Sequence, residues 1–275
     1  MIGGSGQLGS AIRQRWNDCD IVAPAHGEVP LEESATLRDA LDRIRPDVLV
    51  NAAAFHDVDR CENEPERAFA VNAVAVGRAA SLAFERSVLF VTISTDYVFD
   101  GKTDEPYGEE ARPHPLSAYG ASKLAGEYLS DRIGSRAFVV RTCGLYGRSP
   151  SSRKPLVERA LDHQREDGPL RVVADVFASP TYAGDLAVAL RRLIETEAYG
   201  LYHAVNTGPV SWYEFVVAAA ELAGRAVPIE PISAIDWKPA AIRPRFSALK
   251  NARLGTLGIG MPSWRDGIKA YLQVR

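Results

Sequence analysis

The sequence predicts an α/β fold, a doubly wound parallel sheet with a smaller C-terminal lobe. Strand-like and helix-like segments alternate over the first half of the chain, which is typical of a parallel sheet with helices on both faces. Residues 48–54 form a continuous apolar run, as expected of a strand that is buried on both faces. A glycine cluster opens the first predicted helix, where such folds turn from a strand into a helix.

The N-terminal part of the chain contains two predicted helices and one short strand candidate. Apolar residues at helical spacing directly after the glycines predict the first helix: Leu8, Ile12 and Trp16. Residues 20–23 are a short strand candidate. Ser34 is a candidate N-cap for a second helix, which Pro46 ends.

The middle of the chain continues the alternation up to residue 142. We expect strands at 48–54, 88–95 and 137–142, and helices at 64–86 and 116–132. The stretch 96–115 is rich in glycine and proline and is predicted to be a loop. Loops of that length in compact domains tend to be functional.

The alternation loosens beyond residue 143, where a second unit is expected. Helices are predicted at 156–166, 182–195, 212–223 and 264–273. We therefore expect a core over residues 1–145 and a lobe over residues 146–275, some of whose elements return to the core sheet.

Composition excludes several classes of protein. The net charge of −3 comes without a basic stripe, which argues against a nucleic-acid or membrane-surface partner. Three scattered cysteines without a CxxC pair favour a reducing cytoplasm over a disulfide scaffold or a zinc site. The five histidines show no metal spacing, so we expect no metal. No apolar run approaches the roughly 18 residues that span a bilayer.

The glycine cluster Gly3-x-x-Gly6-x-x-Gly9 has the spacing of a dinucleotide-binding turn. Glycines there let the backbone approach a pyrophosphate, which sits at the N-terminus of the following helix. A flexible glycine-rich terminus is the alternative for the motif alone. A strand of about five or six residues should precede the turn, but Met1 and Ile2 alone do so. We expect either that the native chain starts upstream of Met1 or that the sheet lacks most of its central strand.

Tyr119 and Lys123 stand four residues apart on a predicted helix and therefore share one face. A neighbouring ammonium would lower the pKa of the phenol from about 10, which suits a general acid. Chance supplies such a pair in roughly one chain in five. Thr95 ends a predicted buried strand, where α/β sheets place ligand contacts. Ser94 points to the opposite face of the strand, so we expect one of these two hydroxyls to contact the substrate.

These motifs together resemble the extended short-chain dehydrogenases, which share a Rossmann-type sheet, and more narrowly the dTDP-4-dehydrorhamnose reductase family. The resemblance covers almost the whole chain. It rests on the glycine cluster, on Asn51-Ala-Ala-Ala54, on Ser94-Thr-Asp-Tyr-Val-Phe-Asp-Gly101, on Tyr119-Gly-Ala-Ser-Lys123, and on C-terminal segments such as Ser179-Pro-Thr181, Ser211-Trp-Tyr-Glu-Phe215 and Arg243-Pro244.

The resemblance implies NAD(P)H-dependent reduction at C4 of a nucleotide-linked 4-keto-6-deoxy sugar, with residues 1–145 binding the cofactor and residues 146–275 mainly the substrate. Tyr119 would supply the proton, Lys123 would hold the nicotinamide ribose, and Thr95 would orient the carbonyl. The implied cofactor contacts are Gly3, Gly6, Gln7, Leu8, Gly9, Ala52, Ala53, Ala54, Tyr119 and Lys123. The implied substrate contacts are Asp59, Thr95, Asp96, Tyr97 and Arg243.

Some features depart from the family or leave a choice open. The family often has a tryptophan after the strand that ends in Arg141-Thr142, whereas this chain has Cys143-Gly144. The region after residue 23 lacks a clear acidic residue for the ribose 2′-hydroxyl, although Glu28 could substitute, so we favour NADPH over NADH. Arg148, Arg153 and Lys154 could grip the substrate pyrophosphate or form a solvated basic loop.

Two other functions stay open alongside the reductase. A non-catalytic binding subunit is one, because the regulatory beta subunit of methionine adenosyltransferase looks like these reductases. A sugar-nucleotide epimerase or dehydratase that recycles tightly bound NAD is the other. A homodimer is the assembly that we expect if the chain is not a monomer.

Overall fold

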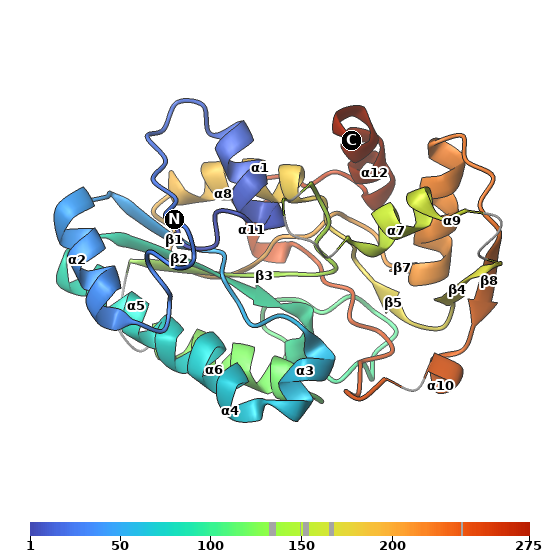
Figure 1. Cartoon of the computed structure of the whole chain (residues 1–275), viewed down its shortest axis with the longest axis horizontal. Coiled ribbons are helices and arrows are strands. Elements are labelled where there is room, and N and C mark those ends of the chain that lie inside the picture. Colours follow the sequence, from blue (N-terminus) through green and yellow to red (C-terminus); the bar gives the residue numbers. More distant parts are fainter. Residues whose placement is uncertain (132–135, 149, 151–153, 165–167, 238) are drawn as a thin grey trace.

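The computed structural model describes residues 1–131, 136–148, 150, 154–164, 168–237 and 239–275. Four parallel strands in the order β1-β2-β3-β6 form the central sheet (Figure 1). They are β1 (Val48–Asn51), β2 (Leu89–Thr95), β3 (Ala137–Thr142) and β6 (Gly200–His203). In the register of the sheet, Val91 lies beside Val50 and Phe138. The predicted α/β class with a parallel sheet is confirmed.

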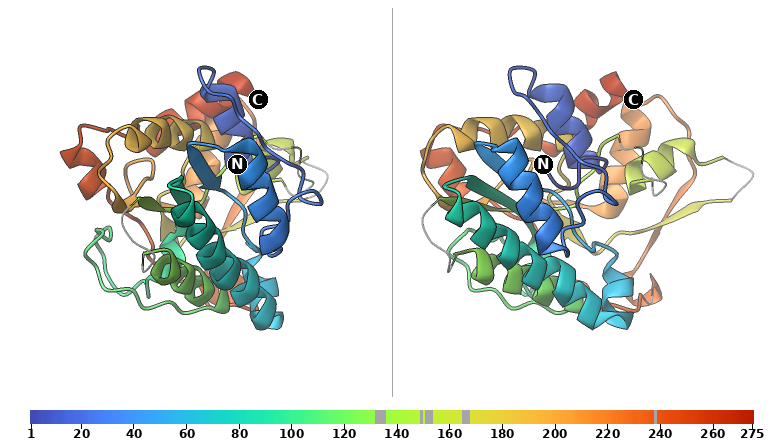
Figure 2. Two further views of the ribbon diagram at one scale, coloured as in Figure 1. Left: turned by 90° about the vertical axis from the view of Figure 1, so that its left-hand side faces the viewer. Right: turned by 60° about the vertical axis from the view of Figure 1, so that its left-hand side comes forward.

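Helices cover both faces of the sheet (Figure 1, Figure 2). Helices α1 (Gln7–Arg15) and α8 (Ala183–Ile194) lie on one face, and α2 (Ser34–Ile44), α5 (Val76–Glu85) and α6 (Ala118–Asp131) lie on the other. Each face has its own hydrophobic core. Leu8, Ile12 and Leu186 belong to the first, and Leu37 and Phe90 to the second.

The first strand of the sheet is reduced to one bridging residue. Ile2 donates its N–H to the Val50 carbonyl at 2.9 Å and accepts from the Ala52 N–H at 3.0 Å. The strand expected over residues 20–23 is wrong, since these residues form no ladder. The physical reason is that a second strand needs a first one beside it. Ile2 forms a single bridge with β1, and, among the described residues, the Met1 amino group donates a hydrogen bond to this stretch at the Val22 carbonyl.

The single helix expected over residues 64–86 is interrupted. Helix α3 (Val58–Asn63) precedes it, and α4 (Pro65–Phe69) runs through the π-helical turn η1 (Ala70–Ala75) into α5. The extra residue of the π turn accompanies a buried Asn72, whose amide bonds Phe55 and Ser122. Pro65–Glu85 is also the one described helix long and apolar enough to cross a membrane, and 61% of its most apolar stretch is buried inside the protein.

The other predicted elements differ from the structure mainly at their ends. β1 ends at Asn51, so residues 52–54 leave the sheet as a loop. A short 3₁₀ turn, η2 (Asp96–Val98), opens the long loop after β2. The expected ends of two helices, Arg132 and Glu166, lie outside the described residues.

The C-terminal half contributes α8 and β6 to the central layers and builds a lobe with its own core. The lobe contains α7 (Leu156–Asp162), α9 (Trp212–Leu222) and α12 (Trp264–Val274), close to the predicted helices. Elements not predicted are β4 (Leu170–Val173), β5 (Phe177–Ala178), β7 (Val210–Ser211), β8 (Ile229–Ile232), α10 (Ala234–Trp237) and α11 (Ala252–Thr256). β4 pairs with β8 and β5 with β7. Buried residues of the lobe core include Leu161, Phe215 and Tyr271.

A Gly126→Ala substitution tests how closely α6 packs on the π turn. A Cβ there would lie 2.2 Å from the Asn72 carbonyl oxygen, so we expect the free energy of unfolding to fall by about 1–3 kcal/mol. Urea unfolding measures the change. Gly255→Ala in α11 is the control, because nothing lies within 4 Å of its Cβ position, and it should be neutral or slightly stabilising. Equal stability of the two variants would contradict this packing.

Candidate active site

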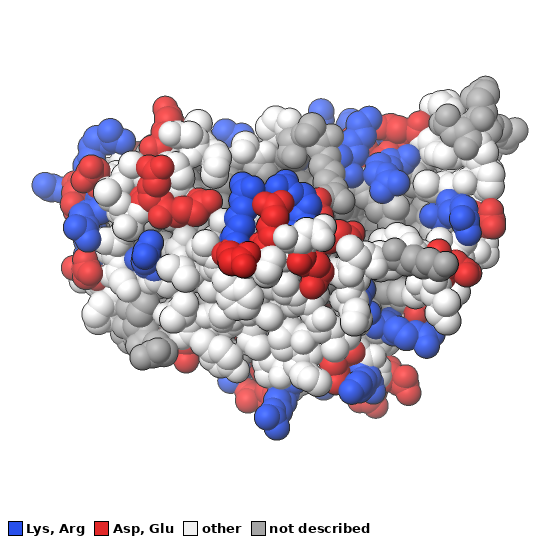
Figure 3. Space-filling view, turned by 60° about the horizontal axis from the view of Figure 1, so that its bottom comes forward, with Lys and Arg blue, Asp and Glu red and all other residues white. Residues whose placement is uncertain are grey.

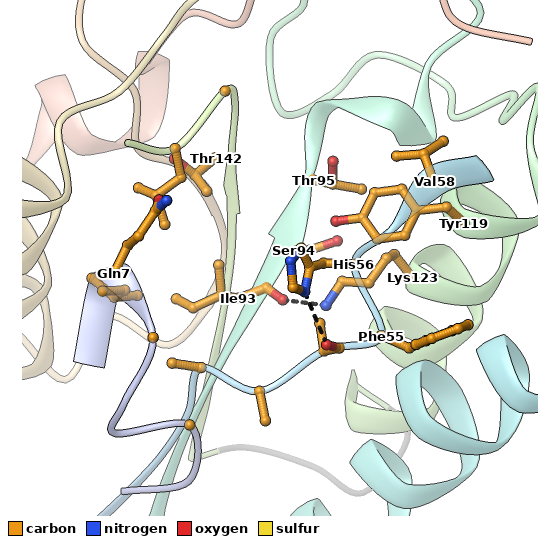
Figure 4. Close-up of a pocket in the computed structure, with 18 of the residues that line it drawn as sticks. Gln7, Phe55, His56, Val58, Ile93, Ser94, Thr95, Tyr119, Lys123 and Thr142 are labelled. Carbon is orange, nitrogen blue, oxygen red and sulfur yellow. Dashed lines mark hydrogen bonds between the residues drawn. The ribbon is translucent and has the colours of Figure 1, made fainter. Parts of the chain in front are cut away.

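A cavity of about 760 Å³ opens at the carboxyl ends of the strands, the edge where open α/β sheets bind ligands. Its lining comes from the glycine turn, from the ends of β1, β2 and β3, and from the C-terminal lobe. The central parts of this lining are drawn in Figure 4. The cavity therefore joins the predicted cofactor-binding and substrate-binding halves of the chain.

The glycine turn can accept a pyrophosphate. Gly3 has a φ of +81°, and a Cβ on it would lie 2.7 Å from the backbone of Ala52 and Ala53. Gly9 would place a Cβ 2.4 Å from the Gly3 carbonyl oxygen, so this glycine packs the helix onto the turn. The predicted contacts that line the cavity are Gly3, Gly6, Gln7, Leu8, Ala52, Ala53 and Ala54. Gly9 is not part of the lining.

Thr142 provides a second sign that this region holds a ligand. Its side chain lines the cavity opposite Tyr119 and Lys123, next to Gln7 (Figure 4). The Thr142 hydroxyl is buried and has no hydrogen-bond partner in the described part of the chain. Buried polar atoms normally find a partner, so this hydroxyl fits a polar group of a bound cofactor.

Thr95, Tyr119 and Lys123 converge at the end of β2. The Tyr119 hydroxyl points toward Thr95, and Lys123 lies below the ring (Figure 4). The Thr95 hydroxyl donates to Asp96 Oδ1 at 3.0 Å and accepts from the Tyr97 N–H at 3.2 Å. The Tyr97 ring packs edge-on against Tyr119 with a centroid separation of 5.9 Å. The three residues predicted to be catalytic thus share one wall of the cavity.

The pKa of Tyr119 differs from expectation. Burial raises it above its ordinary value, and the hydrogen bond with Thr95 offsets part of the rise. Lys123 donates from Nζ to the Ile93 carbonyl at 2.6 Å, and burial lowers its pKa to about 8. The expected depression of the phenol pKa by Lys123 is therefore not seen in this structure, because the ammonium is bound to the backbone and is itself desolvated.

Ser94 and Thr95 have different hydrogen-bond partners. The Ser94 hydroxyl donates to Glu127 Oε1 at 2.5 Å, whereas Thr95 faces Tyr119. Glu127 forms a buried ion pair with Arg141 on β3, with an N–O distance of 2.6 Å. The Ser94 side chain therefore belongs to a buried polar network, although both residues are part of the lining, and Thr95 is the hydroxyl that bonds Tyr119.

Asp96 is almost fully buried and holds neighbouring groups in place. Besides Thr95, the Cys143 thiol donates to its Oδ2 at 3.1 Å, and a Ser247 hydrogen bond reaches the same carboxyl group. Desolvation raises the pKa of Asp96. The structure brings this predicted substrate residue to the cavity, where its carboxylate fixes the direction of the Thr95 hydroxyl.

The structure brings Asp59 and Arg243 to each other. Their side chains form an ion pair at 2.9 Å, and the hydrogen bond to Arg243 lowers the pKa of Asp59. Neither residue is among those that line the cavity, although their neighbours Val58 and Pro244 are. The pair ties the segment before Pro244 to α3. A direct substrate contact by either residue stays a prediction, whereas Tyr97 lies in the lining.

The basic loop after residue 147 is partly engaged with the protein itself. Arg148 donates to the Val274 carbonyl at 2.7 Å, and Lys154 pairs with Asp162 at 2.7 Å. Lys154 lines the cavity. Arg153 lies outside the described residues. Within the described ranges, no cluster of three or more His, Cys, Asp or Glu side chains could hold a metal ion.

Two residues support the site from outside it: Asn72, which was not recognised from the sequence, and Glu62, which we expect from the sequence to serve the start of a helix. Asn72 bonds both backbone groups of Phe55, at 2.9 and 3.0 Å, and the Ser122 hydroxyl at 3.1 Å. It thereby joins the loop after β1 to the helix that carries Lys123. Glu62 accepts the Ala118 N–H at 2.6 Å and so caps the start of α6, one residue before Tyr119. A buried asparagine in an alanine-rich helix was the one local signal for Asn72.

Comparison with known proteins agrees with this geometry. The family model described as "RmlD substrate binding domain" matches residues 1–275. The spore coat polysaccharide biosynthesis protein SpsK of Bacillus subtilis is 33% identical over 277 residues, covering 100% of this chain and 96% of that protein. The dTDP-4-dehydrorhamnose reductase of Sinorhizobium fredii is 33% identical, covering 98% of this chain and 94% of its own.

Solved structures support the same fold. The dTDP-4-dehydrorhamnose reductase of Bacillus anthracis, solved in complex with NADP, has a TM-score of 0.95 at 34% identity and covers 100% of this chain and 98% of its own. The Thermus thermophilus UDP-glucose 4-epimerase, in complex with NAD, has a TM-score of 0.83 at 22% identity, covering 99% of this chain and 96% of its own. The second likeness shows the Rossmann-type fold alone. The predicted fold class and the family resemblance are both confirmed.

The pH dependence of stability tests the burial of Lys123. Its folded-state pKa of about 8 lies below the ordinary 10.5, so the unfolded chain binds more protons between these pH values. The free energy of unfolding should then rise with pH in this window, by at most about 1.4 kcal/mol per pH unit. Urea unfolding at several pH values from 8 to 10.5 should show a rise in the wild type that Lys123→Met lacks. The exposed Lys250→Met is the control, and equal slopes for all three proteins would contradict the assignment.

Proposed function

The chain belongs to the RmlD substrate binding domain family, and we propose that it is an NAD(P)H-dependent reductase of nucleotide-linked 4-keto-6-deoxy sugars. The proposed reaction converts dTDP-4-dehydrorhamnose to dTDP-L-rhamnose. The observation that carries the proposal is the convergence of Thr95, Tyr119 and Lys123 in a cavity that also contains the glycine turn. The names of the Sinorhizobium fredii relative and of the Bacillus anthracis structure support the same activity.

The residues of the cavity divide the chemistry among them. A nicotinamide cofactor held by the glycine turn and by Thr142 would supply the hydride for the carbonyl carbon. Tyr119 donates its phenolic proton to the carbonyl oxygen, and its position is fixed by Thr95 and Tyr97. The high pKa of the buried phenol keeps that proton in place until an acceptor arrives. Lys123 lies beside the same ring (Figure 4), where it would hold the nicotinamide ribose.

We infer that NADPH is the preferred cofactor and that NADH is also accepted. The Glu28 carboxylate accepts the Ala25 N–H at 2.8 Å, so it is engaged with its own loop and is not set up to recognise a ribose 2′-hydroxyl. The NADP found in the Bacillus anthracis structure supports this preference. We assign residues 1–145 to cofactor binding and most of residues 146–275 to the substrate.

The two alternative functions gain no support from the geometry. A pure binding subunit does not need Thr95, Tyr119 and Lys123 placed around one cavity. The epimerase likeness rests on a structure with 22% identity, which carries the fold and no activity. We therefore propose the reductase alone, acting in the cytoplasm, with a nucleotide sugar as its partner and neither nucleic acid nor membrane.

We propose that the chain forms a homodimer through α4, η1, α5 and α6. These helices expose large apolar side chains to solvent: Phe69, Val74, Phe84 and Tyr128. The side of the molecule on which α4 and α6 lie has a broad area without charged groups (Figure 3). Exposed apolar patches of this kind mark protein–protein contact sites more often than the rest of a protein surface does.

Tyr119→Phe tests the reductase proposal directly. The variant keeps the ring but loses the proton donor, so NADPH oxidation with the 4-keto sugar nucleotide should fall by about 10²–10⁴-fold, while NADPH binding stays unchanged. Tyr128→Phe on the exposed face of the same helix should retain wild-type turnover. A Tyr119→Phe enzyme with undiminished turnover, or a wild type inactive on all such sugars, would refute the proposal.

Light scattering after gel filtration tests the dimer. The wild type should have twice the chain mass of 29.9 kDa, and Val74→Glu should have the chain mass, because a charge would be buried in the interface. Ile235→Glu, at another exposed apolar position, is the control and should leave the dimer intact. A wild-type monomer at micromolar concentration would contradict the proposed assembly.

A further inference from the structure

The wall of the cavity next to the end of β3 has an unusual arrangement of Gly144 and Trp212. Gly144 has a φ of +51°, and a Cβ on it would lie 2.6 Å from Cη2 of Trp212 and 3.2 Å from Cα of Pro180. The indole therefore fills the space that any side chain at position 144 would occupy. Both residues line the cavity, so the aromatic surface at this place comes from α9 instead of from the end of β3.

Trp212 is held firmly where it stands. It is the first residue of α9 and lies inside a capping box in which Ser211 and Glu214 bond each other's backbone N–H groups at 3.1 and 3.2 Å. Its own N–H donates to the Val176 carbonyl at 3.2 Å. The Phe215 ring packs edge-on against the indole with a centroid separation of 6.0 Å. Backbone and ring contacts together leave this side chain little freedom.

Short contacts link Trp212 to the reacting centre on the substrate side. Gly144, against which the indole packs, follows Cys143, whose thiol donates to Asp96 at 3.1 Å. Asp96 in turn accepts the hydroxyl proton of Thr95 at 3.0 Å. Val176 and Phe215, which hold Trp212, also line the cavity.

We propose that Trp212 forms the apolar wall of the sugar subsite, packing against the edge of the pyranose ring that bears C5 and its methyl group, and that Gly144 admits the indole to this position. This inference rests on the proposed reductase function. Pocket walls of aromatic side chains gain their energy by removing apolar ligand surface from water. The C6 methyl group of a 6-deoxy sugar is apolar and suits contact with the indole. A hydroxyl group on C6 would lose its hydrogen bonds to water there without gaining a new hydrogen-bond partner.

Two variants test the placement by steady-state kinetics. Trp212→Phe shortens the wall, and Gly144→Ala pushes the indole without removing it. Both should raise the KM for the 4-keto-6-deoxy sugar nucleotide by about tenfold, with the KM for NADPH and the inhibition constant of dTDP, which has no sugar, unchanged. Trp264→Phe is the matched control, since Trp264 packs on Phe215 at 6.2 Å but is not part of the lining. An equal rise in the dTDP inhibition constant would place the indole at the base and overturn the proposal.

Fluorescence provides a readout that does not depend on turnover. The chain has four tryptophans, and dTDP-L-rhamnose, which carries the C6 methyl group, should change the wild-type emission beyond the change that dTDP causes. Trp212→Phe should lose this sugar-dependent part, and Trp264→Phe should keep it. A wild type that turns over no 4-keto sugar but shows this signal refutes the reductase and retains the sugar wall. A wild type without any sugar-dependent signal overturns the wall, whether or not it is an active reductase.

Discussion

The close approach of α6 to neighbouring backbone is the constraint on which the site depends. A Cβ on Gly120 would lie 2.2 Å from the Tyr97 carbonyl oxygen, and one on Gly126 would lie 2.2 Å from that of Asn72. Tyr119 and Lys123 stand on the same helix between these contacts or next to them. Their distance from the end of β2 is therefore set by backbone against backbone, which is stiffer than side-chain packing and leaves the phenol little room to move relative to Thr95.

The close packing of α6 also buries charged side chains away from water. Lys123 is 5% exposed, and the Glu127–Arg141 pair behind it is similarly buried. Each buried charge has a partner: the Ile93 carbonyl for the ammonium, and Ser94 together with Arg141 for the carboxylate. Burial without such partners would cost several kcal/mol. The polar network thus keeps a charged site stable in a low-dielectric region, where electrostatic effects on a developing charge are strong.

The parts that could be predicted are those with a local pattern. Helical and strand periodicity found the main layers, and the motif residues Thr95, Tyr119 and Lys123 fell into one cavity as expected. The π turn escaped prediction because an alanine-rich stretch has the same apolar period with or without one extra residue. The strand at 20–23 depended on a neighbour that is not long enough to pair with it. The Asp59–Arg243 pair joins residues that are 184 positions apart, so no local signal for it exists.

The π turn also makes one segment sensitive to length. The π turn holds one residue more than an α-helical turn and widens to take it up, so α4 and α5 keep their faces on either side of it. Deleting one residue between 70 and 75 would restore the regular advance of about 100° per residue and would remove the widened turn in which Asn72 bonds Phe55 and Ser122. A further insertion would exceed what one widened turn takes up and would rotate α5 relative to α4. Substitutions on the solvent side of this alanine-rich helix are expected to be tolerated, whereas a change of its length would disturb the support of α6.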